Sequence, residues 1–360
     1  MKKNVLADLL NIKYPIIQAP MAGGITTSKL VAEVSETGAL GMIGAGYLTP
    51  YQLKNQIDEI RSLTSKPFGV NLFVPQKFEV NTQDVNSVNQ ILDAINKELN
   101  VTYTEDLVLP NFLEEYEKFN EQIKIIIDMN IPVCSFTFGI PSKEIVASLQ
   151  NANIIVIGTA TTAEEAMEVE KSGIDIIVAQ GAEAGGHRGS FIDESEDSLI
   201  GLMSLVPQVA DTVSKPVVAA GGIMDGRGLM ASICLGAVGV QMGTAFLTCD
   251  ESGAHYVHKN AILNSTENQT VLTRSFSGKW SRGIRNKFIL DMRAYENIFP
   301  VYPVQNNLTQ LIRKASSLQN NKNYMSLWSG QSPRLAKRHT VKSLIQNIIK
   351  DVKDITSSLK

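Results

Sequence analysis

Residues 178–190 hold the side chains best suited to chemistry in this chain. They read Val-Ala-Gln-Gly-Ala-Glu-Ala-Gly-Gly-His-Arg-Gly-Ser, so an apolar run ends at Gln180 and small residues then lead to His187 and Arg188. Glycine has no Cβ and tolerates positive φ, so such a segment can bring backbone N–H groups very close to a flat polar ligand. His187 would be the titratable group at the edge of that ligand. The pattern therefore predicts a binding site with one imidazole.

Eight short apolar runs must position this segment. Each is nearly continuous in hydrophobicity rather than alternating, which is typical of strands buried on both faces of a parallel sheet. Stretches of helical period lie between the runs, so the sequence predicts an α/β fold, a (βα)8 TIM barrel, with a doubly wound open sheet as the alternative. The runs are residues 15–21, 39–46, 67–74, 131–138, 153–160, 174–180, 216–223 and 239–247.

Two regions interrupt the strand–helix rhythm. Residues 75–110 form a polar insertion rich in Asn, Gln and Asp, and residues 251–335 follow the eighth run without strand signals. We expect residues 251–335 to form a small, mostly helical lobe that covers the substrate. Residues 1–250 would form the barrel, and a terminal helix within 336–360, with its isoleucines on one side, would complete it.

The composition excludes several classes of protein. The 360 residues carry a formal net charge of −3 and a pI near 5.9, so no general basic field favours nucleic acid as a partner. The N-terminus does not resemble a signal peptide, and no apolar run approaches the roughly 20 residues of a membrane-spanning helix. Three cysteines, far apart and odd in number, favour reduced thiols and a cytoplasmic location.

In a barrel of this kind the loops that follow the strands gather at one face and form the site. Those loops hold neutral amides, glycines and a single histidine, and they lack the clustered carboxylates of a metal site or a glycosidase. Gly221-Gly222 and Gly243-Thr244 follow strands seven and eight, where barrels commonly bind phosphate through backbone N–H groups. Asn71, Gln180 and Gln241 can hydrogen-bond a heteroaromatic ring. Flavin mononucleotide (FMN) has both a phosphate and a heteroaromatic ring, so it fits both sets of residues.

Four segments resemble the class I nitronate monooxygenases, formerly called 2-nitropropane dioxygenases. They are Gln18-Ala-Pro-Met-Ala-Gly-Gly24, Gly69-Val-Asn-Leu-Phe-Val-Pro75, Gln180-Gly-Ala-Glu-Ala-Gly-Gly-His-Arg-Gly189 and Gln241-Met-Gly-Thr-Ala-Phe246. The resemblance extends to Phe276-Ser-Gly-Lys279 and Leu327-Trp-Ser-Gly-Gln331, and so covers nearly the whole chain. The Gly-Gly-His-Arg-Gly block is specific to the superfamily, and its combination with the other segments narrows the resemblance to this class.

The resemblance implies FMN-dependent oxidation of alkyl nitronates, such as propionate 3-nitronate, by O2 to a carbonyl compound and nitrite. This is a detoxifying reaction without metal or nicotinamide. His187 would be the active-site imidazole, and Met21 would lie close to the flavin ring. The partners would be a small-molecule nitronate and O2, with a homodimer left open. The residues expected to bind the cofactor are Ala19, Pro20, Met21, Asn71, Gln180, Gly185, Gly221, Gly222, Gln241, Met242, Gly243 and Thr244.

His187 can act in two ways that need opposite protonation states. As a cation it would pair with an anionic nitronate, which we favour, and as a neutral base it would remove the α-proton of a nitroalkane. A purely structural role, fixing its own loop, is the alternative. Arg188 either reaches the site or points to solvent.

Other features leave their roles open. The cations of residues 279–287 (Lys279, Arg282, Arg285 and Lys287) either attract an anionic substrate or form a solvated face. His255 and His258 have no evident third ligand for zinc. Trp328 either walls the pocket or packs the lobe onto the barrel.

Three rival functions use the same scaffold. Two are reductases, the FMN-type enoyl-acyl carrier protein reductase and an NADH:quinone reductase, and neither requires the Gly-x-Gly-x-x-Gly fingerprint that this chain lacks. The third is a non-catalytic flavin-binding protein, against which His187 argues.

Overall fold

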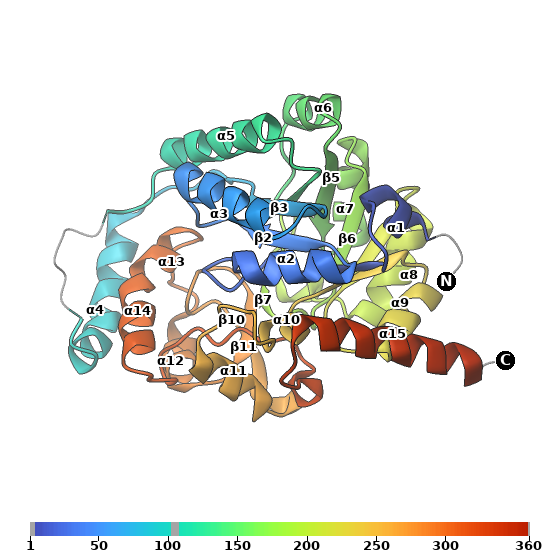
Figure 1. Cartoon of the computed structure of the whole chain (residues 1–360). Coiled ribbons are helices and arrows are strands. Elements are labelled where there is room, and N and C mark those ends of the chain that lie inside the picture. The colour runs from blue at the N-terminus through green and yellow to red at the C-terminus, as the bar shows by residue number, and fades with distance from the viewer. Residues whose placement is uncertain (1–3, 102–107, 359–360) are drawn as a thin grey trace.

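The computed structural model describes residues 4–101 and 108–358, and its centre is a parallel eight-stranded barrel (Figure 1). The strand order is β1-β9-β8-β6-β5-β4-β3-β2, and a bridge between Ile17 and Leu40 joins the two ends of that order. This closure confirms the TIM barrel and excludes the open-sheet alternative. The strands are β1 (Ile16–Gln18), β2 (Gly41–Gly44), β3 (Phe68–Phe73), β4 (Val133–Thr137), β5 (Ile155–Ala160), β6 (Ile176–Gln180), β8 (Val217–Ala220) and β9 (Gly239–Met242).

Helices surround the barrel, as the alternating pattern predicts. Several begin with a side-chain cap, such as Thr27, whose hydroxyl accepts from Leu30 N, and Thr162, whose hydroxyl accepts from Glu165 N. The outer helices are α2 (Ser28–Thr37), α3 (Pro50–Leu63), α5 (Phe112–Asp128), α6 (Lys143–Asn151), α7 (Ala163–Lys171), α8 (Leu202–Thr212) and α9 (Gly226–Cys234). A single turn, α10 (Thr244–Leu247), follows β9, and α15 (Val341–Ser358) packs between α9 and α2.

Two apolar layers hold the barrel together. The outer layer lies between strands and helices, and the inner layer fills the barrel itself with residues such as Met42, Ile157 and Val218. The short helix α1 (Val5–Leu10) contributes Leu6 and Leu10 to the inner layer. Within the described residues, no helix is both long and apolar enough to cross a membrane.

The lobe has a core of its own on one side of the barrel. It contains α11 (Tyr256–Leu263), α12 (Lys287–Met292), α13 (Val304–Leu308) and α14 (Gln310–Leu318). The insertion after β3 joins it, because α4 (Thr82–Glu98) lies near α14 (Figure 1) and shares its apolar cluster. Short 3-10 turns cover η1 (Glu196–Ser198), η2 (Glu267–Gln269), η3 (Arg293–Tyr295) and η4 (Pro333–Leu335).

Residues 251–335, which carry no strand signals, contain two short strands besides their helices. β10 (Thr270–Thr273) and β11 (Ser281–Ile284) form an antiparallel pair, and β11 also pairs with β7 (Gly186–His187) from the loop after β6. These strands are short and partly polar, so they carry neither the continuous apolar run nor the clear alternation that identifies a strand in sequence. Their small sheet ties the Gly-Gly-His loop of the barrel to the lobe.

Candidate functional site

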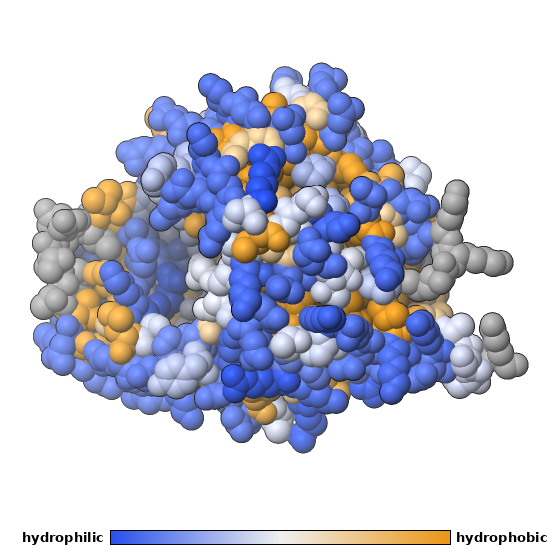
Figure 2. Space-filling model, in the orientation of Figure 1, coloured by the Kyte–Doolittle hydropathy of each residue, from blue (hydrophilic) through white to orange (hydrophobic). Residues whose placement is uncertain are grey.

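A cavity of about 1040 Å3 lies where the carboxyl ends of the barrel strands face the lobe. On the face in Figure 2 the surface is mostly hydrophilic and is hollowed between barrel and lobe. His187 and all but one of the predicted cofactor-binding residues line this cavity. The exception is Met242, whose side chain is buried among the strands and outer helices, because successive side chains of a strand point to opposite faces.

The loops after β8 and β9 offer backbone donors to the cavity. Gly221 and Gly222 have φ angles of +128° and +66°, which favour glycine over other residues. Within the described part of the chain, the N–H groups of Gly222, Ile223, Gly243 and Thr244 donate no backbone or side-chain hydrogen bond. Free backbone donors that line one cavity are groups that can bind an anion such as phosphate.

The amide side chains at the site differ in the hydrogen bonds that they already make within the protein. Asn71 Nδ2 donates to Ser135 Oγ (2.9 Å) and to Thr137 Oγ1 (3.1 Å), which fixes its orientation. Gln180 Oε1 accepts from Gly189 N (2.8 Å) and its Nε2 donates to the His187 carbonyl (3.2 Å). Gln180 therefore shapes the Gly-Gly-His loop as well as lining the cavity.

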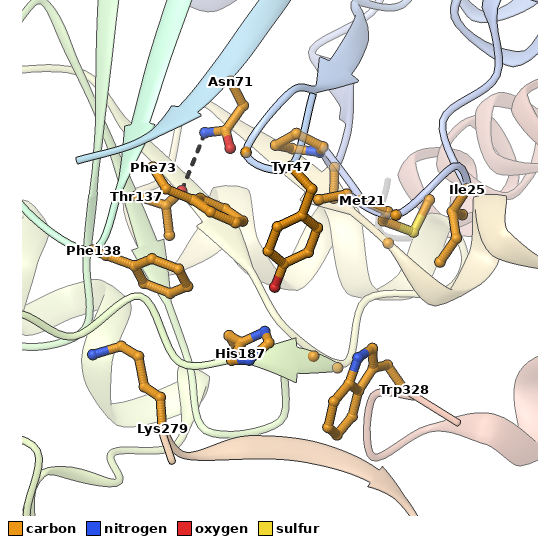
Figure 3. Close-up of a pocket in the computed structure, with 18 of the residues that line it drawn as sticks. Met21, Ile25, Tyr47, Asn71, Phe73, Thr137, Phe138, His187, Lys279 and Trp328 are labelled. Atoms are coloured by element: carbon orange, nitrogen blue, oxygen red, sulfur yellow. Dashed lines mark hydrogen bonds between the residues drawn. The ribbon is translucent and has the colours of Figure 1, made fainter. Parts of the chain in front are cut away.

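His187 is held among aromatic rings at the centre of the cavity (Figure 3). Its ring centroid lies 5.6 Å from that of Trp328, 5.8 Å from Phe138 and 5.9 Å from Tyr302. Its Nε2 is buried and has no hydrogen-bond partner among the described residues. Burial, with Lys279 and Arg313 nearby, lowers the pKa of His187 to about 3.

The imidazole is therefore neutral at pH 7, which differs from the cationic role that the sequence favoured. A neutral ring can still donate one hydrogen bond to an anion or accept a proton. The unpartnered Nε2 is the atom available for either.

Arg188 neither reaches the cavity nor points to solvent. It is 3% exposed, and its guanidinium donates to the Gln180 carbonyl and to the Ser198 carbonyl, both at 3.1 Å. Its backbone N–H donates to Trp280 O at 2.8 Å. Arg188 thus holds the loop that carries His187 and has a structural role.

Of the cations in residues 279–287, only Lys279 lines the cavity. Its Nζ donates to the Ser190 carbonyl (2.8 Å), forms an ion pair with Glu194 and lies 5.2 Å from the Phe138 ring centroid. Arg282 is buried and donates to the Ala182 carbonyl, whereas Arg285 and Lys287 are exposed. Lys279 therefore lines the site, Arg282 has a structural role, and Arg285 and Lys287 are solvated.

His255 and His258 are engaged separately at the edge of the cavity. The Nδ1 of His255 accepts from Val257 N, and Nε2 of His258 lies 2.8 Å from the Trp328 carbonyl oxygen. Among the described residues, no three His, Cys, Asp or Glu side chains are grouped to hold a metal ion. Trp328 fulfils both suggested roles, since its ring faces the cavity and also packs on Phe276 of the lobe core at 5.5 Å.

Comparison with known proteins identifies the family. A model of nitronate monooxygenase matches residues 3–351 of the chain. The chain belongs to the nitronate monooxygenase family. It is 51% identical over 359 residues to a probable nitronate monooxygenase of Staphylococcus haemolyticus, covering 99% of each chain. A Staphylococcus aureus protein with the same name is 51% identical over 354 residues, 98% of each chain.

Solved structures agree with this membership. Nitroalkane oxidase from Streptomyces ansochromogenes superimposes with a TM-score of 0.90 at 38% identity, covering 99% of both chains. FabK from Thermotoga maritima gives a TM-score of 0.78 at 30% identity, covering 100% of this chain and 99% of that one. Membership makes this chain an oxidoreductase, and the enzymes of the nitronate monooxygenase family and its neighbours use flavin in general.

Several cavity residues of this nitronate monooxygenase family member escaped the sequence analysis. Tyr47 and Phe138 follow β2 and β4, so the rule that strand-end loops form the site could have found them. Tyr302 and Arg313 come from the lobe, where no motif or periodicity marks them. Figure 3 shows Tyr47, Phe73 and Phe138 on the side of the cavity around His187, and Tyr302 and Arg313 line the same cavity.

Proposed function

We propose that this chain uses FMN to oxidise alkyl nitronates with O2 to a carbonyl compound and nitrite, and that the reaction is detoxifying. One observation carries the proposal. A single cavity joins the backbone cradle at Gly222 and Gly243 to a neutral, unpartnered imidazole at His187. A phosphate-bearing planar cofactor suits the first end, and a small anionic substrate suits the second.

The residues present fit FMN. The cavity volume of about 1040 Å3 lies at the upper end of the ~300–1,000 Å3 usual for ligand sites, so cofactor and small substrate can share it. Gly221, Gly222, Gly243 and Thr244 would hold the phosphate, and Asn71, Gln180 and Gln241 would hold the ring. When bound, FMN supplies the electron acceptor for the nitronate and passes the electrons to O2.

The chain itself positions the substrate. A nitronate has already lost its α-proton, so His187 need only donate a hydrogen bond from its neutral ring to keep the anion in place. With a neutral nitroalkane, the same ring would take the α-proton at Nε2. Phe138, Tyr302 and Trp328 surround it and exclude water, and the lobe would cover the substrate.

The cysteines of the chain bear on its location in the cell. Cys134, Cys234 and Cys249 are free thiols, which suits a reducing compartment, so we propose the cytoplasm. The sequence leaves a homodimer open, and we propose no particular oligomeric state.

The visible spectrum of the purified protein tests the function. We expect a flavin spectrum, or its recovery on adding FMN, that bleaches with propionate 3-nitronate without O2 and returns in air with release of nitrite. A protein that stays colourless after FMN is added would reject the cofactor. The likeness to FabK motivates a parallel addition of NADH, because bleaching by NADH with no response to nitronate would assign the chain to the reductases.

A further inference from the structure

We propose that Ser332, near the C-terminal end of the lobe, binds the phosphate of the flavin cofactor together with the backbone donors of Gly222 and Gly243. This inference rests on the proposed function, because it adds a residue to the place at which FMN would be held. Ser332 lines the cavity and lies immediately before the turn η4. It directly follows the segment 327–331 that resembles the family, and the sequence gave it no role.

The lobe backbone just before this serine is fixed against two loops of the barrel. Gly330 N donates to Thr244 Oγ1 (2.9 Å), and Gln331 N donates to the Glu183 carbonyl (2.9 Å). The approach is close enough to require glycine, since a Cβ on Gly185 would come within 2.4 Å of Gly330 N. The loops after β6 and β9 therefore determine where this part of the lobe lies.

This placement brings the hydroxyl of Ser332 beside the loop after β8. A Cβ on Gly222 would come within 3.5 Å of Ser332 Oγ. Within the part of the chain that the structure describes, neither the hydroxyl nor the backbone N–H of Ser332 donates a hydrogen bond. Both groups are therefore available to a ligand, next to the free N–H groups of Gly222 and Ile223.

Glu183 is also close to Gly222, but its carboxylate is directed elsewhere. A Cβ on Gly222 would lie 3.2 Å from Glu183 Cβ. The two carboxylate oxygens accept from Leu202 N, at 2.8 and 2.9 Å, at the first residue of α8. The negative charge is thus stabilised by the N-terminus of that helix. We therefore expect the donors of Ser332, rather than this carboxylate, to face an anion beside Gly222.

The lobe also affects the threonine of the same site. Thr244 Oγ1 accepts from Gly330 N, so the hydroxyl keeps its own proton to donate to a ligand. A phosphate could then receive hydrogen bonds from the barrel loops and from Ser332 of the lobe. Hydrogen bonds to a charged group contribute more than those between neutral groups, so each donor should affect the affinity for FMN. Riboflavin has the same ring without the phosphate and should not depend on Ser332.

Titration of the full-length apoprotein with FMN and with riboflavin tests the inference. We expect Ser332→Ala to raise the Kd for FMN about tenfold, as for the loss of one hydrogen bond to a charged group, and to leave the Kd for riboflavin unchanged. Ser332→Thr keeps a hydroxyl and should regain most of the affinity. Ser317→Ala is the matched control, because Ser317 is also half-buried and lines the cavity but lies on α14.

Two further readouts complete the test without turnover. The phosphorus NMR signal of FMN in the holoenzyme should shift in Ser332→Ala and not in Ser317→Ala. Equal losses of FMN and riboflavin affinity in Ser332→Ala, or an unchanged FMN affinity, would overturn the role of Ser332.

Inorganic phosphate separates this inference from the proposed function. If the wild type binds no flavin, the proposed function fails. A rise in melting temperature with phosphate in the wild type and in Ser317→Ala, absent in Ser332→Ala, would still support the anion site. No rise in any of the three proteins, or the same rise in all of them, would overturn it.

Discussion

His187 pairs with Ser281 in antiparallel register, so a barrel loop and a strand of the lobe hold the same imidazole. Backbone pairing fixes the strand direction, and the side chain then points into the cavity between Phe138 and Trp328 (Figure 3). The position of the ring thus depends on two segments far apart in the sequence. Changes in either segment are expected to alter the reaction.

Replacement of His187 tests its part in the reaction. His187→Asn keeps a polar side chain but removes the ring nitrogen that faces the substrate. We expect kcat/KM for propionate 3-nitronate to fall about 10- to 100-fold, because the hydrogen bond that positions the anion is lost or displaced. Flavin content should be unchanged, and His339→Asn, outside the cavity, should behave as the wild type. An unaltered kcat/KM in His187→Asn would remove the imidazole from the mechanism.

The low pKa of His187 predicts how stability depends on pH. The unfolded chain takes up a proton at this residue as the pH falls below about 6.5, whereas the folded protein does so only near pH 3. The folded state binds fewer protons in between, so stability falls as the pH is lowered through this window. Between pH 7 and pH 5, urea unfolding should show a loss larger in the wild type than in His187→Asn, by on the order of 1 kcal/mol. Parallel losses in the two proteins would contradict a His187 that stays neutral in the folded protein.

Glu165 is expected to stabilise the segment that follows His187. Its fully buried carboxylate accepts from Thr161 N (2.6 Å), Phe191 N (2.6 Å) and Ile192 N (3.0 Å). Glu165→Gln would turn an NH2 group toward N–H donors, which should cost about 1–3 kcal/mol of unfolding free energy. Its exposed neighbour in Glu164→Gln should change stability by less than about 0.5 kcal/mol. Similar urea midpoints for the two variants would show that this carboxylate does not anchor the segment.

Glycine substitutions can separate cofactor binding from backbone strain. Gly222→Ala places a Cβ at φ +66° beside the donors of the cradle, so FMN affinity should fall at least about tenfold. Gly173→Ala imposes a similar strain at φ +91°, but on the αβ turn before β6 and away from the cavity. Both variants should lose stability, by about 1–2 kcal/mol, and only Gly222→Ala should lose flavin in a fluorescence titration. A flavin affinity equal in both would argue against the cradle.

The barrel could be predicted because its strands are buried on both faces. Runs such as 174–180 and 216–223 are nearly uniform in hydrophobicity, and β6 and β8 lie within these two runs. The strands of the lobe could not be predicted in the same way. Its strands β10 and β11 are held by pairing with each other and with β7, which is a property of the tertiary structure rather than of local composition.

The sequence placed residues at the cavity where they follow barrel strands, although their roles there stay predictions. Gln180 and Gly222 could be placed because the loops after parallel strands meet at one face. Met242 was wrongly expected to line the cavity. Successive side chains of a strand point to opposite faces, so Met242 points away from the cavity that its neighbours Gln241 and Gly243 line. Arg188 was misjudged because its role depends on the Ser198 carbonyl, which only the fold brings to it. No motif or periodicity in the sequence marks Arg313, because only the folding of the lobe onto the barrel brings α14 to the cavity.

The position of α15 has a consequence for the order of folding during synthesis. This helix packs between α9 and α2, yet it is translated after the whole lobe. While the ribosome makes the lobe, the apolar surfaces that later contact Leu344, Ile345 and Ile348 stay open to water. The lobe can therefore begin to pack before the barrel is covered. A nascent chain stalled before residue 341 should expose a surface that chaperones bind, and should take up flavin poorly.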